Sequence, residues 1–421
     1  MTIFAPITGR GGAVSTVRLS GPGADKVLAA LVGELPQVRR ASLRALRWGG
    51  LVLDHALVVR FAGPQSFTGE DCVELSLHGG RAVLAAVSAA LVALGARPAE
   101  PGEFSRRAFL NGRMDLLAAE AMADLIAAET EAQRRLAVDG ADALHEACAR
   151  WREALRQVLA WQEALIDFPD EDLPPEVEAG LLAELAALHG EMVAALAGAP
   201  AAERLREGLE FVILGAPNAG KSTLLNALAG EEVAIVSEFA GTTRDAVGVR
   251  VDLGGVPVHL TDTAGLRATE DFVEAEGVRR ARARAAKADL VIAVAAPGAD
   301  FEAVPEGVEV LQVRTKADLG GGAGLAVSAA TGVGMERLRA ALAAAAGRLT
   351  DTRGAAALAR PRQVACVRDT AEALARAMAE GEPELRGEEL RAAAAALARL
   401  MGVIGVEEIL DAVFSGFCIG K

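Results

Sequence analysis

The stretch "GAPNAGKS", residues 215–222, decides the fold of the central part of this chain. It matches the spacing G-x-x-x-x-G-K-[ST] of a loop that binds nucleotide phosphates. The apolar "EFVILG" precedes it and the helical "TLLNALAG" follows it, which is the strand–loop–helix context that the motif requires. Backbone N–H groups of the loop can wrap the phosphates, while Lys221 reaches the β and γ phosphates and Ser222 holds Mg²⁺. A chance glycine-rich turn is the alternative, and the flanking elements argue against it.

Two further motifs predict how the triphosphate and its metal are held. "GTTRD" (241–245) supplies Thr243 as a second Mg²⁺ ligand. "DTAG" (262–265) ends an apolar stretch, which places Asp262 near the metal and the Gly265 N–H near the γ-phosphate. In many GTP-hydrolysing switches a glutamine follows this glycine and orients water, but here the residue is Leu266.

Two motifs near residue 320 predict guanine recognition. In "TKAD" (315–318), Asp318 can accept two hydrogen bonds from guanine, and Lys316 can lie along the ring. "SAATG" (328–332) can close over the base. Thr315 stands where such motifs usually have asparagine, and its hydroxyl has a shorter reach than an amide. The predicted GTP contacts are Asn218, Ala219, Gly220, Lys221, Ser222, Thr223, Ser237, Thr242, Thr243, Asp262, Thr263, Ala264, Gly265, Thr315, Lys316, Asp318, Ser328, Ala329 and Ala330.

The patterns of β-type and helical segments along the sequence divide the 421 residues into several parts. Residues 1–112 mix short β-type runs with one helical stretch near 81–94, as in a small α/β domain. Residues 113–206 and 347–421 are helical, and 207–346 alternate strands with helices, as in a P-loop GTPase domain. We expect a discontinuous helical domain with the GTPase domain inserted between its halves; a row of separate domains is the alternative.

Bulk composition narrows the function. The net charge of −14 argues against a protein that coats nucleic acid by charge alone. The four cysteines form no CxxC pair, and no secretory signal precedes the first strand, so a cytoplasmic protein is the simplest interpretation. The most apolar stretch, residues 180–200, contains Glu184, His189 and Glu191 and indicates an amphipathic helix instead of a membrane span.

Several motifs together resemble the MnmE (TrmE) family of tRNA-modification GTPases. They are "GRGGAVSTVRLSG", "AGPQSFTGEDCVELSLHGG", "RPAEPGEFSRRAFLNGRMDL", "ALIDFPDED", "GAPNAGKSTLLNALAG", "AIVSEFAGTTRD", "DTAGLR" and the C-terminal "FSGFCIGK". The resemblance implies an N-terminal α/β domain that binds folate and dimerises. It further implies a flavoprotein partner of the MnmG type that contains FAD, in a heterotetramer. With that partner, family members install a carboxymethylaminomethyl-type group at carbon 5 of the wobble uridine of certain tRNAs.

The resemblance also implies specific site residues. The folate contacts map to Arg18, Glu74, Arg113 and Lys421, with 5-formyl-tetrahydrofolate or a related reduced folate as the ligand. The arginines would clamp the anionic glutamate tail, and Glu74 would accept hydrogen bonds from the pterin edge. Cys418 is either a small apolar filler or a thiol near the tRNA chemistry, where Lys421 would favour the thiolate.

Similar potassium-activated GTPases suggest how hydrolysis proceeds without a glutamine. A K⁺ ion would take the place of an arginine finger. Its expected ligands are Asn218, Ser237, the Phe239 carbonyl and Thr242, while Glu274 lies at the catalytic glutamate position and would place the water. A rival interpretation is an RNA-binding GTPase of ribosome assembly, although no basic module is visible; a membrane-remodelling or scaffold GTPase is a third, without an identifiable lipid-binding stretch.

Overall fold

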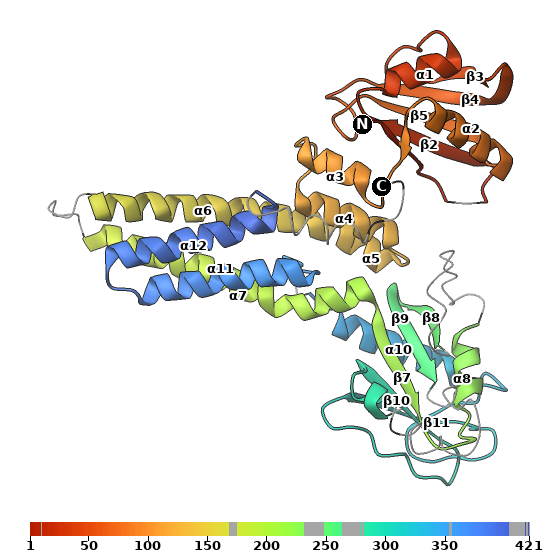
Figure 1. Cartoon of the computed structure of the whole chain (residues 1–421). Helices are drawn as coiled ribbons and strands as arrows, with labels where there is room; N and C mark the ends of the chain where they lie inside the picture. Colours follow the sequence, from red (N-terminus) through yellow and green to blue (C-terminus); the bar gives the residue numbers. More distant parts are fainter. Residues whose placement is uncertain are drawn as a thin grey trace. The chain divides into compact units, whose positions relative to one another are not determined.

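The computed structural model describes residues 1–9, 11–167, 175–230, 248–262, 279, 282–352, 356–403, 417 and 420. The chain divides into two compact units (Figure 1). The first consists of Met1–Ala123 with Ala398–Lys421, and the second of Asp124–Leu397.

A six-stranded sheet organises the first unit. Its order is β3-β4-β5-β2-β1-β6, and all neighbours are antiparallel except the pair β1 and β6. The strands are β1 (Ile3–Pro6), β2 (Val14–Ser20), β3 (Ser42–Trp48), β4 (Leu51–Phe61), β5 (Cys72–His78) and β6 (Arg97–Pro98).

Strand alternation decides which face of this sheet is covered. On β5, Val73, Leu75 and Leu77 are buried in the core, so Glu74 and Ser76 point to the other face. Helices α1 (Ala24–Val32) and α2 (Arg81–Ala93) add Leu28 and Leu91 to that core. The expected helix near 81–94 is confirmed as α2. Helices α1 and α3 (Glu103–Leu110) were not expected, because they have only 9 and 8 residues and so give a weak periodic signal.

The C-terminal tail returns to the first strand. Phe417 is buried against Leu116 and Ala119 of α4 (Leu116–Ala127). A Cβ atom on Gly420 would lie 2.1 Å from the carbonyl oxygen of Pro6, so only glycine fits this approach. Gly420 is therefore held against the end of β1, beside β2.

Asp54 fixes the end of β5 in this unit. Its carboxylate accepts hydrogen bonds from the backbone N–H groups of His55 and His78, both at 2.8 Å, and its Oδ1 lies 2.7 Å from the His78 Nδ1. Burial raises the pKa of Asp54, but the hydrogen bonds from His78 and His55 outweigh it and leave the pKa below its ordinary value. The carboxylate therefore stabilises the fold only while it is ionised.

We expect Asp54→Ala to lower the free energy of unfolding at pH 7 by about 1–3 kcal/mol, because it removes the acceptor of two backbone N–H groups. A depressed folded-state pKa means that this contribution is present above the unfolded pKa and disappears as the pH falls through the folded one. The gap between wild type and variant in denaturant unfolding should thus close in acid. The exposed Glu34→Ala is the matched control; a gap that persists undiminished in acid would contradict the assignment.

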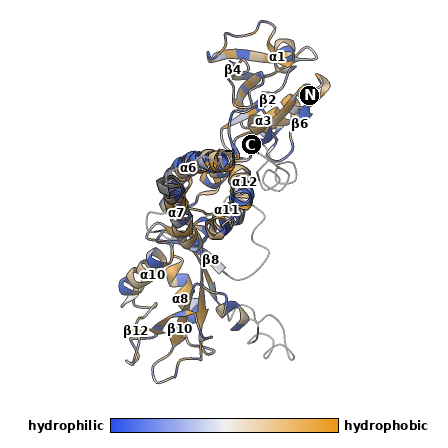
Figure 2. Cartoon of the chain, turned by 90° about the vertical axis from the view of Figure 1, so that its left-hand side faces the viewer, coloured by the Kyte–Doolittle hydropathy of each residue, from blue (hydrophilic) through white to orange (hydrophobic). Residues whose placement is uncertain are grey.

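The second unit combines a helical part with a GTPase lobe. The helical part contains α5 (Glu131–Arg135), the π-helical turn η1 (Leu136–Gly140), α6 (Ala141–Asp167), α7 (Pro175–Glu207), α11 (Pro361–Ala379) and α12 (Pro383–Met401). Figure 2 looks nearly along α6, α7, α11 and α12, which lie beside one another.

Contacts between distant segments hold these helices together. The Gln162 side chain donates to the Pro383 carbonyl at 2.8 Å, and Arg206 donates to the Ala359 carbonyl at 2.7 Å. These contacts join the helices before the GTPase lobe to those after it. The predicted discontinuous helical domain with an inserted GTPase domain is therefore confirmed, while the boundaries at 112, 206 and 346 stay predictions.

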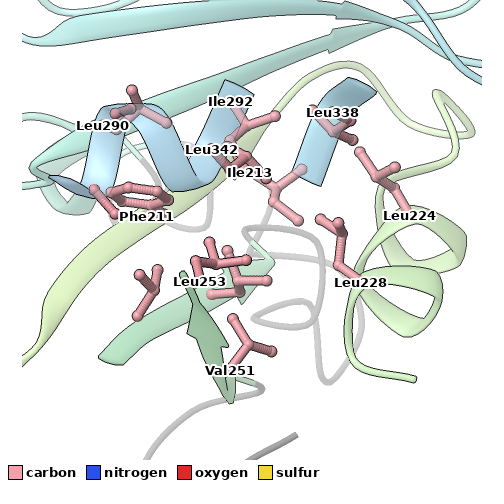
Figure 3. Close-up of a cluster of buried hydrophobic side chains, with 14 of the residues drawn as sticks. Phe211, Ile213, Leu224, Leu228, Val251, Leu253, Leu290, Ile292, Leu338 and Leu342 are labelled. Carbon is pink, nitrogen blue, oxygen red and sulfur yellow. The ribbon is translucent and has the colours of Figure 1, made fainter. Parts of the chain in front are cut away.

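The GTPase lobe has a second six-stranded sheet of order β12-β11-β10-β7-β9-β8, parallel except for the antiparallel pair β8 and β9. The strands are β7 (Leu209–Leu214), β8 (Gly248–Leu253), β9 (Val256–Asp262), β10 (Leu290–Ala295), β11 (Glu309–Arg314) and β12 (Leu325–Ala326). Leucines of α8 (Lys221–Leu228) and α10 (Met335–Leu349) pack with Phe211 and Ile213 on one face (Figure 3). Val212, Leu214 and Val291 pack with Ala285 on the other. Parallel strands bring the predicted motifs to one edge.

By length and composition, one helical segment of the described chain, Glu178–Glu207 in α7, is apolar enough to cross a membrane. In the structure, Leu181, Leu185 and Met192 of this segment are buried, and α7 packs against α6 and α11. A core helix of a helical bundle meets the same criterion.

Candidate functional site

The loop between β7 and α8 forms a cradle. A Cβ atom on Gly215 would lie 2.2 Å from the Val294 carbonyl oxygen, and Gly220 has a φ of 91°, so the loop winds as only glycine allows. Lys221 is buried, and its ammonium donates to the carbonyl oxygens of Gly215 and Ala216 at 2.6 and 2.8 Å. The cation therefore lies inside the loop, at the mouth of a helix N-terminus, where phosphate oxygens are favoured.

Two oxygen ligands meet beside this cradle. The Ser222 hydroxyl, in the first turn of α8, donates to the Asp262 carboxylate at 2.6 Å, and Asp262 is the last residue of β9. A hydroxyl and a carboxylate at this spacing are hard oxygen ligands, which suit Mg²⁺. The residues present therefore fit the predicted metal.

The predicted base-recognition residues lie at the neighbouring strand ends. Lys316 has a φ of 51° and donates to the Asn218 carbonyl at 3.0 Å, which ties this motif to the phosphate loop. Asp318 is exposed, and a hydrogen bond from the Ser328 hydroxyl holds the pKa of its carboxyl below the ordinary value. Asp318 is therefore ionised at neutral pH and faces the loop that continues through Ala329 and Ala330.

Thr315 shows what replaces the usual asparagine. Its hydroxyl is buried and donates to the Ala219 carbonyl at 2.6 Å, with the Ala295 carbonyl at 3.3 Å. The hydroxyl thus keeps the bond between the base motif and the phosphate loop despite its shorter reach. Asp318 remains the residue predicted to select guanine.

Several predicted GTP, metal and catalytic residues lie outside the described residues. They are Ser237, Phe239, Thr242, Thr243, Thr263, Ala264, Gly265, Glu274, Cys418 and Lys421. Asn218, Ala219 and Gly220 lie in the described loop and Thr223 in the first turn of α8.

The first unit brings Arg18 and Glu74, two of the four predicted folate residues, to one face of its sheet. Arg18 and Glu74 are register partners on β2 and β5, and they form an ion pair at 2.8 Å. The Arg18 guanidinium lies 4.5 Å from the centre of the Phe67 ring, in the loop between β4 and β5. Arg113 contacts the same loop, since a Cβ atom on Gly69 would meet its Cγ at 3.2 Å.

Comparison with known proteins identifies the family. The profile described as "GTP-binding protein TrmE N-terminus" matches residues 2–113, and the profile "MnmE helical domain" matches residues 116–418. The chain belongs to the MnmE family. A protein of Acidiphilium cryptum named "tRNA modification GTPase MnmE" is 62% identical over 425 residues, which cover 100% of this chain and 98% of that one. A protein of the same name from Gluconacetobacter diazotrophicus is 54% identical, with 100% and 99% covered. Among solved structures, the G domain of the T. maritima FeoB iron transporter is 24% identical over 32% of this chain and 98% of its own, with a TM-score of 0.24.

This MnmE-family chain also places residues near Arg18 and Glu74 that the motifs alone did not single out. The Ser20 hydroxyl lies 2.6 Å from the Thr68 hydroxyl and donates to Glu70 at 2.7 Å, and Arg107 donates to Glu70 at 2.9 Å. Phe104 lies under Arg18, at 5.7 Å from the guanidinium. The alternation of side chains along a strand could have indicated Ser20, which lies two residues after Arg18 and so on the same face of β2. No pattern in the sequence indicated that Arg107 of helix α3 would lie nearby.

Proposed function

We propose that this chain is a GTPase that acts in tRNA modification. One observation carries the proposal: the phosphate cradle, the Ser222–Asp262 pair and the Thr315–Lys316–Asp318 motif meet at one edge of a sheet, in a chain that matches the MnmE family throughout. Lys221 and the loop N–H groups bind phosphate, Ser222 and Asp262 hold Mg²⁺, and Asp318 selects guanine. When bound, Mg²⁺ neutralises charge on the phosphate oxygens.

The finer reaction that we propose follows the family. With an FAD-containing partner of the MnmG type, the chain installs a carboxymethylaminomethyl-type group at carbon 5 of the wobble uridine. A reduced folate supplies one carbon. The sequence has no flavin-binding fingerprint, which supports a separate redox partner.

The experiment for this function is complementation. In a strain that lacks the native gene, expression of this chain should restore the modified wobble uridine, measured by mass spectrometry of tRNA nucleosides. Restoration by an inactive variant such as Lys221→Ala would contradict a role for GTP hydrolysis. Failure of the wild-type chain would contradict the tRNA function.

We propose that K⁺ activates hydrolysis, with Asn218, Ser237, Phe239 and Thr242 as ligands and Glu274 placing the water. Asn218 is exposed in the phosphate loop, which supports access to an ion there. GTP turnover should be at least about tenfold faster in K⁺ than in Na⁺, because a cation offsets transition-state charge. Glu274→Ala should abolish turnover and retain GTP binding. Equal rates in the two salts would exclude the ion, and an active Glu274→Ala enzyme would exclude the glutamate.

For folate, the ion pair between Arg18 and Glu74 refines the assignment. Because the two side chains touch, they would meet the same part of the ligand and not its opposite ends. The aromatic ring of Phe67 and the loop contact of Arg113 add to the same neighbourhood. Lys421 follows Gly420, which lies against the neighbouring strand β1. We therefore propose this face as the site for 5-formyl-tetrahydrofolate or a related reduced folate.

Arg18→Ala should weaken binding of 5-formyl-tetrahydrofolate by about tenfold to a hundredfold, the loss of one charge-assisted hydrogen-bond partner. Calorimetry on the purified chain measures this affinity. Arg47→Ala, at an exposed arginine on β3, is the control that should bind like wild type. No folate binding by wild type would disprove the site, and unchanged affinity in Arg18→Ala would remove Arg18 from it.

We also propose a cytoplasmic homodimer. Leu43 and Leu57 are register partners on β3 and β4 and are 67% and 45% exposed on the same sheet face as Glu74. An exposed apolar sheet face of this kind favours self-association. Sedimentation of the purified chain tests the homodimer: the wild type should sediment as a dimer, and Leu57→Glu should weaken the association.

A further inference from the structure

Glu210 joins three parts of the GTPase lobe. It lies near the start of β7, and its side chain is 28% exposed. Its Oε1 accepts the Thr261 hydroxyl at 2.7 Å and the Arg284 Nε at 3.1 Å, while its Oε2 lies 2.8 Å from the His259 Nδ1. None of the nucleotide motifs includes Glu210.

Two partners of Glu210 lie on either side, in the sequence, of residues predicted to take part in GTP hydrolysis. Thr261 directly precedes Asp262 on β9 and is fully buried. Arg284 lies beyond the motif "DTAG" and beyond Glu274 in the sequence. The Oε1 atom of Glu210 therefore binds one residue that precedes the stretch with "DTAG" and Glu274 in the sequence, and one residue that follows it.

The backbone of Glu210 adds a second connection. Its N–H donates to the Asp289 carboxylate and its carbonyl accepts the Asp289 N–H, both at 2.9 Å. The other Asp289 carboxylate oxygen pairs with Arg204 of α7 at 2.8 Å. The side chain and the backbone of Glu210 thus fix residues 284 and 289, and Asp289 connects this point to the helical part of the unit.

We propose that Glu210 is a positioning residue for GTP hydrolysis. Its carboxylate fixes the spacing between Thr261, which directly precedes Asp262 on β9, and Arg284. Strand β7 leads from Glu210 directly into the phosphate loop. Glu210 therefore also fixes the positions of Thr261 and Arg284 relative to the phosphate cradle. This inference rests on the proposed GTPase activity. Because chemistry depends on placement to a fraction of an ångström, a loose spacing lowers kcat more than it lowers nucleotide affinity.

The test compares Glu210→Gln, Arg284→Gln and the double variant in the full chain. Each single variant should lower kcat for GTP by about tenfold, and the double variant should be no worse than either single one, because both remove the same connection. The KM for GTP and the affinity for GDP should change by less than about twofold, since no phosphate or base contact is altered. Arg284→Lys should recover part of the loss.

The control is Arg282→Gln, an exposed arginine two residues away whose turnover should equal that of wild type. Wild-type kcat in folded Glu210→Gln overturns the inference, and so does a fall in GDP affinity that matches the fall in kcat. If Glu210→Gln fails to fold, Arg284→Gln decides, because its side chain is 32% exposed. A wild-type chain that hydrolyses no GTP would instead contradict the proposed function itself.

Discussion

Asp318→Asn is expected to weaken GTP binding by about a hundredfold to a thousandfold, because in the proposed site the ionised carboxylate would accept two N–H groups of guanine and an amide can accept only one. The amide NH₂ would then face a donor of the base. The hydrogen bond from Ser328 lowers the pKa of the wild-type carboxyl below its ordinary value, so the loss at neutral pH is that of a charged acceptor.

The same change should favour a different base. Xanthine carries a carbonyl oxygen where guanine carries its amino group, so Asp318→Asn should bind xanthosine nucleotides more tightly than wild type does. Competition with a fluorescent nucleotide measures both affinities. Asp300→Asn, at an exposed position outside the nucleotide motifs, should behave like wild type. Unchanged GTP affinity in Asp318→Asn would show that guanine is read elsewhere.

Ser222→Ala is expected to reduce GTP turnover by about a hundredfold, since it removes one of the proposed Mg²⁺ ligands at the phosphate cradle. The effect should appear in kcat and in the Mg²⁺ concentration needed for half-maximal activity. Ser222 is exposed, and its hydroxyl donates to the Asp262 carboxylate at 2.6 Å, so the fold should survive the loss of this hydroxyl.

Ser222→Thr is the matched variant for this prediction, because threonine retains the hydroxyl and satisfies the motif. It should keep most of the activity. If Ser222→Ala hydrolyses GTP at the wild-type rate with an unchanged Mg²⁺ requirement, Ser222 does not hold the metal.

Much of the fold could be predicted from the sequence. The alternation of apolar runs and helices from residue 207 indicated a parallel sheet with a phosphate loop, and β7, the loop and α8 confirm it. The helical segments on both sides indicated one discontinuous domain. Helix α1 was not predicted, because the nine residues between Gly23 and Gly33 are too few to show a clear helical period.

The candidate site was predicted unevenly. Lys221, Ser222 and Asp318 were predicted because a loop or strand end fixes each within a motif of a few residues. The folate roles of Arg18 and Glu74 came from the family resemblance, and their contact with each other was not foreseen. The Phe67 ring beside Arg18 was equally invisible, because it depends on how the loop between β4 and β5 folds over the sheet.

The sequence by itself determined the identity and order of the nucleotide motifs, because backbone geometry ties each motif to a fixed local spacing. Only the tertiary structure decided which distant residues meet. Thr315 bonds to Ala219 across 96 positions, Arg18 pairs with Glu74 across 56, and Glu210 gathers Thr261 and Arg284 across 51 and 74. Strand order and register bring these residues together, and for the strand residues Arg18, Glu74, Glu210 and Thr261 a shift of one residue would turn the side chain to the opposite face of the sheet.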